Sequence, residues 1–268
     1  MKKILALPAE LYQNRKLVLS LAKNDFKTKY AGSYFGTIWA FIQPIVTICV
    51  YWFVFGLALR NGSDKGVPFV LWLIAGLIPW FFFQEVLSGG TNALMEYSYL
   101  VKKVVFQIDI LPIIKLISAL FVHLFFIAFA IFVYIIMGKT PIVQMAQLGY
   151  YTICAICLIT AIAYFTCSIV PFFRDFGTII NILMQVGMWA CPIMWDMSTF
   201  KMPAKVEFLL KLNPLYYVVQ GYRDSFMDGI WFFERPKMTI YFWVVTLIIG
   251  VIGFTVFRRL RVHFSDVL

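Results

Sequence analysis

Six long stretches of this chain contain no Asp, Glu, Lys or Arg. They are residues 36–59, 66–84, 116–138, 140–173, 176–195 and 238–257. A helix rises about 1.5 Å per residue, so about 20 apolar residues cross a hydrocarbon core of about 30 Å. Lipid offers the backbone no hydrogen-bond partners, and the stretches do not alternate between polar and apolar residues as barrel strands do. The sequence therefore predicts an all-α membrane protein with six transmembrane helices.

The charged residues lie between and around these stretches, and they give the chain a net charge of +10. Anionic lipid head groups account for basic residues beside membrane spans, so the charge does not indicate nucleic acid binding. Lys and Arg are frequent before residue 36, at residues 102–103 and after residue 257, whereas the short opposite turns contain only Arg60, Lys65 and Lys139. The positive-inside rule then predicts that both termini are cytoplasmic and that residues 196–237 lie outside.

The predicted organisation has three parts: a cytoplasmic N-terminal region (1–35), a six-span domain (36–257) and a basic cytoplasmic tail (258–268). In the N-terminal region, Leu17, Leu21 and Phe26 recur at roughly helical spacing among basic residues. Such a basic amphipathic helix typically lies in the membrane interface. Two interpretations stay open: a solvated helix that follows the positive-inside rule, or a collar that touches a cytoplasmic partner.

The predicted outer segment contains two short apolar pieces, residues 206–212 and 215–227, separated by Asn213 and Pro214. Neither piece is long enough to cross a membrane, and apolar pieces of this length are typically interfacial or re-entrant. We expect two short re-entrant helices that form an outer lid between spans five and six. The glycine-containing run at residues 88–92 predicts that span two has ended by that point.

The predicted spans contain few groups suited to chemistry. His123 is the only deeply placed ionisable residue, and it is more consistent with hydrogen-bonded packing than with a proton relay, because ion-coupled transport usually needs carboxylates at this depth. Cys154 and Cys157 form a CxxC without a second pair, which favours packing over a metal or redox role. The sequence also lacks a G-x-x-x-x-G-K-[ST] phosphate loop and a nucleophile beside a base. We expect no catalytic residue, metal site or cofactor in this chain.

Two predicted spans carry uncharged polar and aromatic residues along one helix face. In span one these residues are Trp39, Gln43, Thr47 and Tyr51; in span five they are Thr178, Asn181, Gln185, Met188, Trp189 and Pro192. Amides can bond sugar hydroxyls while aromatic rings stack on sugar CH faces, so the two faces together favour a path for a hydroxyl-rich cargo. The alternative is hydrogen bonding between helices, which contributes about 1–2 kcal/mol per bond at most.

Several short motifs occur in a familiar order. They are residues 21–30 (LAKNDFKTKY), 36–44 (GTIWAFIQP), 173–175 (FRD), 191–193 (CPI), 212–216 (LNPLY) and 222–223 (YR). In this order and spacing the chain resembles, over nearly its whole length, the ABC-2 family of exporter permeases for lipid-linked polysaccharide, O-antigen and teichoic acid. Residues 51–56 (YWFVFG) and 67–69 (VPF) are most similar to the teichoic acid branch.

The resemblance implies a complex in a bacterial plasma membrane, with membrane lipids around it. A second copy of the chain would pair with the first, and two cytoplasmic ABC ATPase subunits would bind ATP and Mg. The cargo would be an undecaprenyl-linked glycopolymer. By position, residues 96–103 and the next inner turn would dock on the ATPase, residues 23–30 would form the interfacial helix, and the break after residue 212 would separate the helices of an outer gate.

The residues that the resemblance assigns to these roles fall into three sets. The ATPase-coupling residues are Glu96, Tyr97, Leu100, Lys102, Lys103, Arg174 and Asp175. The interfacial-helix residues are Lys23, Asp25, Lys27 and Lys29. The outer-gate residues are Asn213, Pro214, Tyr222 and Arg223. Spans one and five would line the channel, in agreement with the polar faces found from spacing alone.

The sequence therefore favours the transmembrane permease subunit of an ATP-driven glycopolymer exporter, without an ATPase site of its own. One alternative is an exporter from another ABC-2 branch that moves a drug or lipid along a hydrophobic path. The other is a membrane scaffold that transports nothing, or a lipid-modifying enzyme. The sequence does not identify the polymer, its lipid carrier or its direction of threading.

Overall fold

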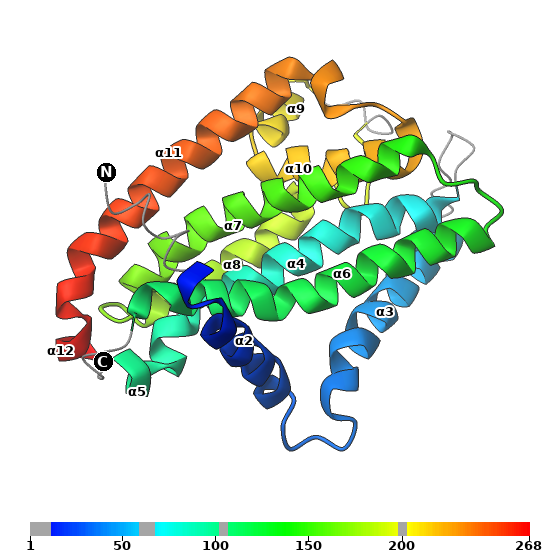
Figure 1. The fold of residues 1–268 in the computed structure, drawn as a ribbon. Coiled ribbons are helices and arrows are strands. Elements are labelled where there is room, and N and C mark those ends of the chain that lie inside the picture. The colour runs from blue at the N-terminus through cyan, green and yellow to red at the C-terminus, as the bar shows by residue number, and fades with distance from the viewer. Residues whose placement is uncertain (1–11, 59–67, 102–106, 198–202) are drawn as a thin grey trace.

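A computed structural model describes residues 12–58, 68–101, 107–197 and 203–268, and all regular structure within these residues is helical (Figure 1). The helices are α2 (Arg15–Lys29), α3 (Trp39–Tyr51), α4 (Phe69–Glu96), α5 (Ser98–Val101), α6 (Leu111–Ile136), α7 (Leu148–Ile169), α8 (Asp175–Ala190), α9 (Ala204–Lys211), α10 (Pro214–Arg223), α11 (Pro236–Leu260) and α12 (Phe264–Val267). Leu59, Gly66, Lys102 and Lys103, which bound predicted spans or belong to the predicted coupling segment, lie outside the described residues.

Within the described residues, five helical segments are long and apolar enough to cross a membrane. They are Gly36–Gly56, Phe69–Glu96, Ile108–Ile136, Val143–Ile169 and Pro236–Val267. Each corresponds to one of the predicted spans. The remaining predicted span, residues 176–195, is occupied by α8, which has 16 residues. The helical fold class is therefore confirmed, and five of the predicted spans are helices of sufficient length and apolar character.

Helix α4 is longer than the sequence predicts, because it continues through residues 88–92 to Glu96. The two glycines in this run are sites of close packing. A Cβ atom at Gly90 would lie 3.0 Å from the Ala163 side chain, and one at Gly89 would lie 3.4 Å from Cδ of Lys115. The prediction that span two ends there was wrong, since a small residue that admits a neighbouring helix looks the same in a sequence as one that breaks a helix.

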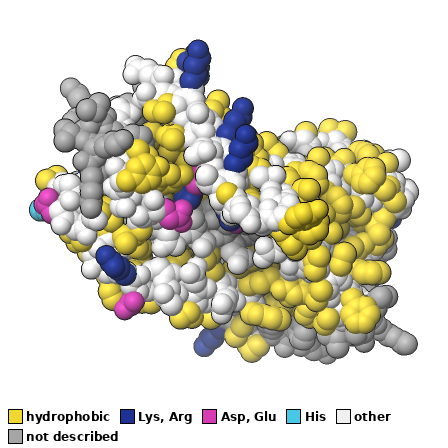
Figure 2. Space-filling view, turned by 90° about the horizontal axis from the view of Figure 1, so that it is seen from below, with side chains coloured by type: hydrophobic (Ala, Val, Ile, Leu, Met, Phe, Trp, Pro, Cys, Tyr) yellow, Lys and Arg dark blue, Asp and Glu magenta, His cyan; other side chains and the backbone are white. Residues whose placement is uncertain are grey.

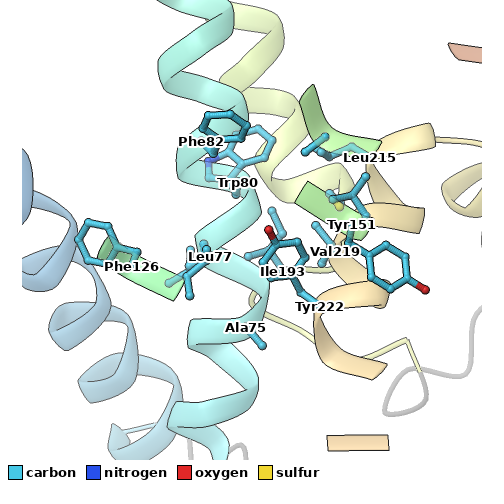
Figure 3. Packing of buried hydrophobic residues seen from close by; sticks show 14 of the residues in the cluster. Ala75, Leu77, Trp80, Phe82, Phe126, Tyr151, Ile193, Leu215, Val219 and Tyr222 are labelled. Atoms are coloured by element: carbon cyan, nitrogen blue, oxygen red, sulfur yellow. The ribbon is translucent and has the colours of Figure 1, made fainter. Parts of the chain in front are cut away.

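The main core surrounds α4 and α7, the most buried of the long helices. Figure 3 shows Trp80 and Phe82 of α4 among side chains from α6, α7 and α10. Two glycines allow close contact between helices: a Cβ atom at Gly221 would overlap the Tyr151 side-chain ring, and one at Gly253 would lie 2.5 Å from the Ala161 backbone carbonyl oxygen. Close backbone approach of this kind is the usual mode of helix packing in membranes.

A second apolar cluster lies at one end of the bundle and joins both ends of the described chain. It contains Val18 and Ala22 of α2, Leu94 of α4, and Phe257 and Phe264 near the C-terminus. Helices α2 and α12 therefore lie toward the same end (Figure 1).

The break predicted at Asn213 and Pro214 separates two short helices. The Asn213 side chain accepts a hydrogen bond from the Leu215 backbone N–H at 3.0 Å, and Pro214 occupies the first turn of α10. This is an ordinary helix N-cap, with Pro where no N–H is needed. Helix α9 has no buried residue, whereas most of α10 is buried.

Candidate functional site

An open cavity of about 430 Å³ lies between α3, α4 and α6, with Met188 of α8 also on its wall. Its polar lining includes Gln43, Thr47, Tyr51, Gln84, Ser88 and His123, and its aromatic lining includes Tyr30, Phe81, Phe82 and Phe126. The Thr47 hydroxyl donates to the backbone carbonyl oxygen of Gln43 at 2.9 Å. The wall thus combines amide and hydroxyl groups with aromatic rings.

The structure brings four of the eight predicted lining residues to this cavity: Gln43, Thr47, Tyr51 and Met188. Trp39, Gln185 and Trp189 are exposed and lie away from its wall. Asn181 is also exposed, but its Oδ1 lies 3.4 Å from the hydroxyl of the lining residue Ser88. The α3 face therefore meets the cavity directly, whereas most of the α8 face points to the surroundings of the molecule.

A second cavity of about 330 Å³ shares Lys29, Glu85 and Ser88 with the first and is lined almost entirely by polar residues. In Figure 2 the charged side chains gather over the half of this face near α2 and α12, while the other half is almost free of charge. The polar cavity lies between α2 and the end of α4. The two cavities adjoin at the residues that they share, and the second has more charged residues in its lining than the first.

Four residues around the second cavity form a cluster that we call the ionic junction: Asp25, Glu96, Tyr97 and Lys115. The Lys115 ammonium donates to Asp25 Oδ1 at 2.6 Å and also pairs with Glu96. The Tyr97 hydroxyl donates to the same Asp25 oxygen at 2.7 Å. Burial and the Asp25 carboxylate both raise the pKa of Tyr97 far above its usual range, so its hydroxyl remains a donor.

A separate ion pair joins Lys29 at the end of α2 to Glu85 of α4. Burial alone would lower the pKa of Lys29, but the adjacent Glu85 carboxylate outweighs burial and the pKa is raised. The lysine therefore stays charged. Both side chains are more than 40% exposed, at 43% and 42%, so this contact is weaker than the ionic junction.

The predicted coupling residues that the structure describes lie at the same end of the molecule as α2. Glu96 and Tyr97 belong to the ionic junction, and Leu100 packs against the second apolar cluster. Arg174 and Asp175 are exposed in the turn that opens α8. Of the predicted interfacial residues, Lys23 and Lys27 are exposed, whereas Asp25 is buried. Sequence reasoning missed Lys115 as the partner of Asp25, because the two residues are 90 positions apart.

Three consecutive residues at the end of α10, Tyr222, Arg223 and Asp224, form what we call the α10 clamp. Arg223 donates to the Pro192 and Ile193 carbonyl oxygens at 2.6 and 2.8 Å. Its guanidinium carbon lies 3.5 Å from the centroid of the Trp72 ring. This cation therefore joins the end of α8 to α4 and α10.

The other two clamp residues reach the remaining long helices. The Tyr222 hydroxyl lies 2.9 Å from His123 Nε2 and 2.8 Å from the Thr152 hydroxyl. Asp224 pairs with Arg235 at 3.1 Å, immediately before α11. Tyr222 and Arg223, which were predicted to belong to an outer gate, are thus buried among five helices. A pattern of sequence spacing contains no signal for these contacts.

The described residues contain no group of three or more His, Cys, Asp or Glu side chains placed to hold a metal ion. Cys154 and Cys157 are free thiols on α7. The arrangement of the site thus provides hydrogen-bonding groups, aromatic surfaces and ion pairs between helices. These groups can bind and guide a molecule and can join moving parts.

Known proteins match this chain over most of its length. The family profile described as ABC-2 type transporter matches residues 16–227. The O-antigen export system permease protein RfbA of Myxococcus xanthus is 24% identical over 263 residues, which cover 98% of this chain and 99% of RfbA. RfbA of Klebsiella pneumoniae is 26% identical over 260 residues, with 94% and 95% covered. The polysialic acid transport protein KpsM of Escherichia coli is 22% identical over 242 residues, with 90% and 92% covered.

Proposed function

The chain belongs to the ABC-2 type transporter family, and on this premise we propose that it exports a lipid-linked glycopolymer as the permease subunit of an ATP-driven complex. It is a multi-pass membrane permease related to O-antigen and polysialic acid export permeases. Permeases of this family act with ABC ATPase subunits. The proposed cargo is an undecaprenyl-linked polymer of the teichoic acid, O-antigen or capsule type.

The observation that carries this proposal is the lining of the cavity beside α3. Gln43 and Gln84 supply amides, Ser88 supplies a hydroxyl, and Tyr51 and Phe82 supply rings on the same wall. A sugar presents hydroxyl groups around its rim and CH groups on its faces, so this mixture of groups suits it. The charged lining residues Lys29 and Glu85 pair with each other, whereas ion-coupled transport usually needs carboxylates deep in the membrane. A drug or lipid exporter from another branch would use mainly the apolar part of the wall.

The proposed membrane topology has six crossings. The position of α2 and α12 at the same end of the bundle supports an even number of crossings. The five long spans then require one more crossing, and α8 is the remaining helix of suitable length. Its 16 residues extend about 24 Å, and the turn after it adds several more. In this topology both termini are cytoplasmic, α2 is interfacial, and α9 and α10 are re-entrant from outside.

The proposed complex contains two copies of this chain and two ATPase subunits. Helices α3 and α8 carry exposed polar groups that a second copy would enclose with the cargo. Residues 96–103 and the turn at Arg174 and Asp175 would dock on the ATPases. Charge reversal at both Lys102 and Lys103 should then separate ATP hydrolysis from export. Full coupling in that variant would contradict the docking assignment.

The proposed function can be tested by reconstituting the chain with its ATPase partner in lipid vesicles. Undecaprenyl-linked teichoic acid or O-antigen should stimulate ATP hydrolysis several-fold and should appear inside inside-out vesicles. Undecaprenyl phosphate alone serves as the matched control for the lipid anchor. Stimulation and uptake with a hydrophobic drug, and none with any glycopolymer, would favour the alternative exporter.

A further inference from the structure

We propose that the ionic junction passes motion from the segment after α4 to α2, with Lys115 as its positioning residue. This inference rests on the proposed function, in which that segment docks on the ATPase. The junction joins three helices that are far apart in sequence. Asp25 lies on α2, Glu96 ends α4 and Tyr97 follows it, and Lys115 lies on α6.

Lys115 is the central residue of the junction. Its ammonium contacts both carboxylates and lies 5.2 Å from the centroid of the Tyr97 ring. Its stem crosses α4 at Gly89, where a Cβ atom would be 3.4 Å from Lys115 Cδ. Lys115 and Asp25 are only 12% and 9% exposed. A buried carboxylate deprived of its partner is strongly unfavourable, so Asp25 is expected to follow Lys115 and Tyr97 when they move.

Helix α2 makes a second polar contact one turn further on. Val18, Ala22, Asp25 and Lys29 share one face of α2, since they are spaced by three or four residues. Asp25 is held firmly by the junction, whereas the pair between Lys29 and Glu85 is exposed and weak. Glu85 also lines the cavity beside α3.

The two contacts of α2 therefore differ in strength, and this difference determines which of them yields when the docking segment moves. The strong contact lies beside the proposed ATPase-docking segment, and the weak contact lies at the cavity. When the docking segment moves, α2 should move with it, and the pair between Lys29 and Glu85 should yield. Because α2 leads through residues 30–38 directly into α3, its displacement changes the cavity wall that carries Gln43 and Thr47.

The first test measures how α2 moves when the reconstituted complex with its ATPase binds nucleotide. Spin labels are placed at Asn24→Cys on α2 and Leu247→Cys on α11, in a background with the exposed Cys49 replaced by Ser. The distance between the labels should change with ATP in the otherwise native chain and should stay unchanged in Lys115→Met. An equal change in Lys115→Met would overturn the proposal. This readout needs no cargo, so it remains decisive even where no glycopolymer stimulates the complex.

The second test compares export with ATP hydrolysis. Lys115→Met should keep ATP hydrolysis within about twofold while export per ATP falls at least about tenfold. Lys115→Arg should restore most of the export, because it keeps the charge beside Asp25. Lys16→Met removes an exposed lysine of α2 and serves as the matched control, with no expected change. Equal export per ATP in Lys115→Met and the native chain would overturn the proposal.

Two milder variants cover the case in which Lys115→Met does not assemble. Tyr97→Phe removes one hydroxyl that donates to Asp25, and Asp25→Asn removes the charge but keeps the shape. Each should reduce export per ATP by about three- to tenfold, which corresponds to about 0.7–1.4 kcal/mol, the range of one ordinary hydrogen bond. Native coupling in both variants would overturn the role assigned to the junction.

Discussion

Helices α8 and α11 are both exposed along one side, but their exposed faces differ in chemistry. Between residues 240 and 252 of α11, the exposed side chains are Ile240, Val244, Leu247, Ile248, Val251 and Ile252. Between residues 178 and 189 of α8, the exposed side chains include aliphatic residues and, in addition, Thr178, Asn181, Gln185 and Trp189. In proteins, an amide that is removed from water without a hydrogen-bond partner costs about 1–3 kcal/mol. We infer that α11 faces lipid and that α8 faces water, cargo or a second copy.

Helices α3 and α4 also differ, in how much of each is buried. About 67% of the most apolar part of α4 is buried, against 11% for α3. Yet α3 carries Gln43 and Thr47 on the cavity wall. The buried helices thus form a scaffold, whereas the helices with exposed polar groups are those suited to contact cargo. The following predictions test this division between scaffold and path.

The largest effect is expected from a side chain added inside the scaffold. Gly221→Ala places a methyl group inside the Tyr151 ring, so the α10 backbone or the ring would have to shift within the packed core. The free energy of unfolding should fall by about 3 kcal/mol, seen as a lower Tm in detergent. Gly149→Ala is the control on α7, because a Cβ atom there meets nothing within 4 Å. Equal stability of the two variants would contradict the close packing of α7 and α10.

An exchange of surface chemistry should affect α11 more than α8. Leu247→Gln puts an amide on the face assigned to lipid, and we expect it to destabilise the protein by about 2 kcal/mol. Gln185→Leu should leave stability unchanged or raise it, while lowering export. Thermal unfolding in vesicles measures both. Destabilisation by Gln185→Leu that matches Leu247→Gln would show that the two faces have the same surroundings.

Removal of aromatic rings from the proposed path should reduce export without loss of assembly. Trp39→Ala, Tyr51→Ala and Trp189→Ala each remove a surface for sugar stacking, worth about 1 kcal/mol or about fivefold in binding. Export per ATP is the quantity to measure, and copurification with the ATPase is the control. Trp52→Ala, an exposed ring near the end of α3, provides a comparison. Unchanged export in all three variants would remove the sugar-lining assignment.

The smallest stability effect is expected at the exposed pair between Lys29 and Glu85. Pairs at this exposure contribute about 0–1 kcal/mol, so Glu85→Gln should lower the unfolding free energy by less than about 1 kcal/mol. High salt should abolish even this difference. Denaturation in low and high salt checks both expectations, and a larger effect would place this pair in the scaffold.

Much of the fold was predictable because it depends on local patterns. Runs of apolar residues predicted the long helices, and Asn213 with Pro214 marked a true helix boundary. Helical spacing also placed Gln43, Thr47 and Tyr51 on one face, and that face meets the cavity. Spacing relates residues within one helix, so these features follow from neighbouring positions alone.

The remaining features depend on which helix faces which. Lys115 of α6 bonds Asp25 of α2, although the two residues are 90 positions apart in the sequence. Arg223 was assigned to a gate by resemblance, yet it joins α10 to the end of α8 and to Trp72. Gly89 and Gly90 suggested a helix end and are instead packing sites. One sequence contains no information on these partners until the helices are assembled.

The most direct test of the central claim is photocrosslinking to radiolabelled undecaprenyl-linked glycopolymer during turnover. A photoreactive residue replaces Thr47 on the cavity wall or Leu247 on the exposed face of α11. If the cavity wall lines the export path, the polymer's sugar chain should be labelled in an ATP-dependent way from position 47 and not above background from position 247. Equal labelling from both positions, or labelling from position 247 alone, would contradict this role of the cavity wall.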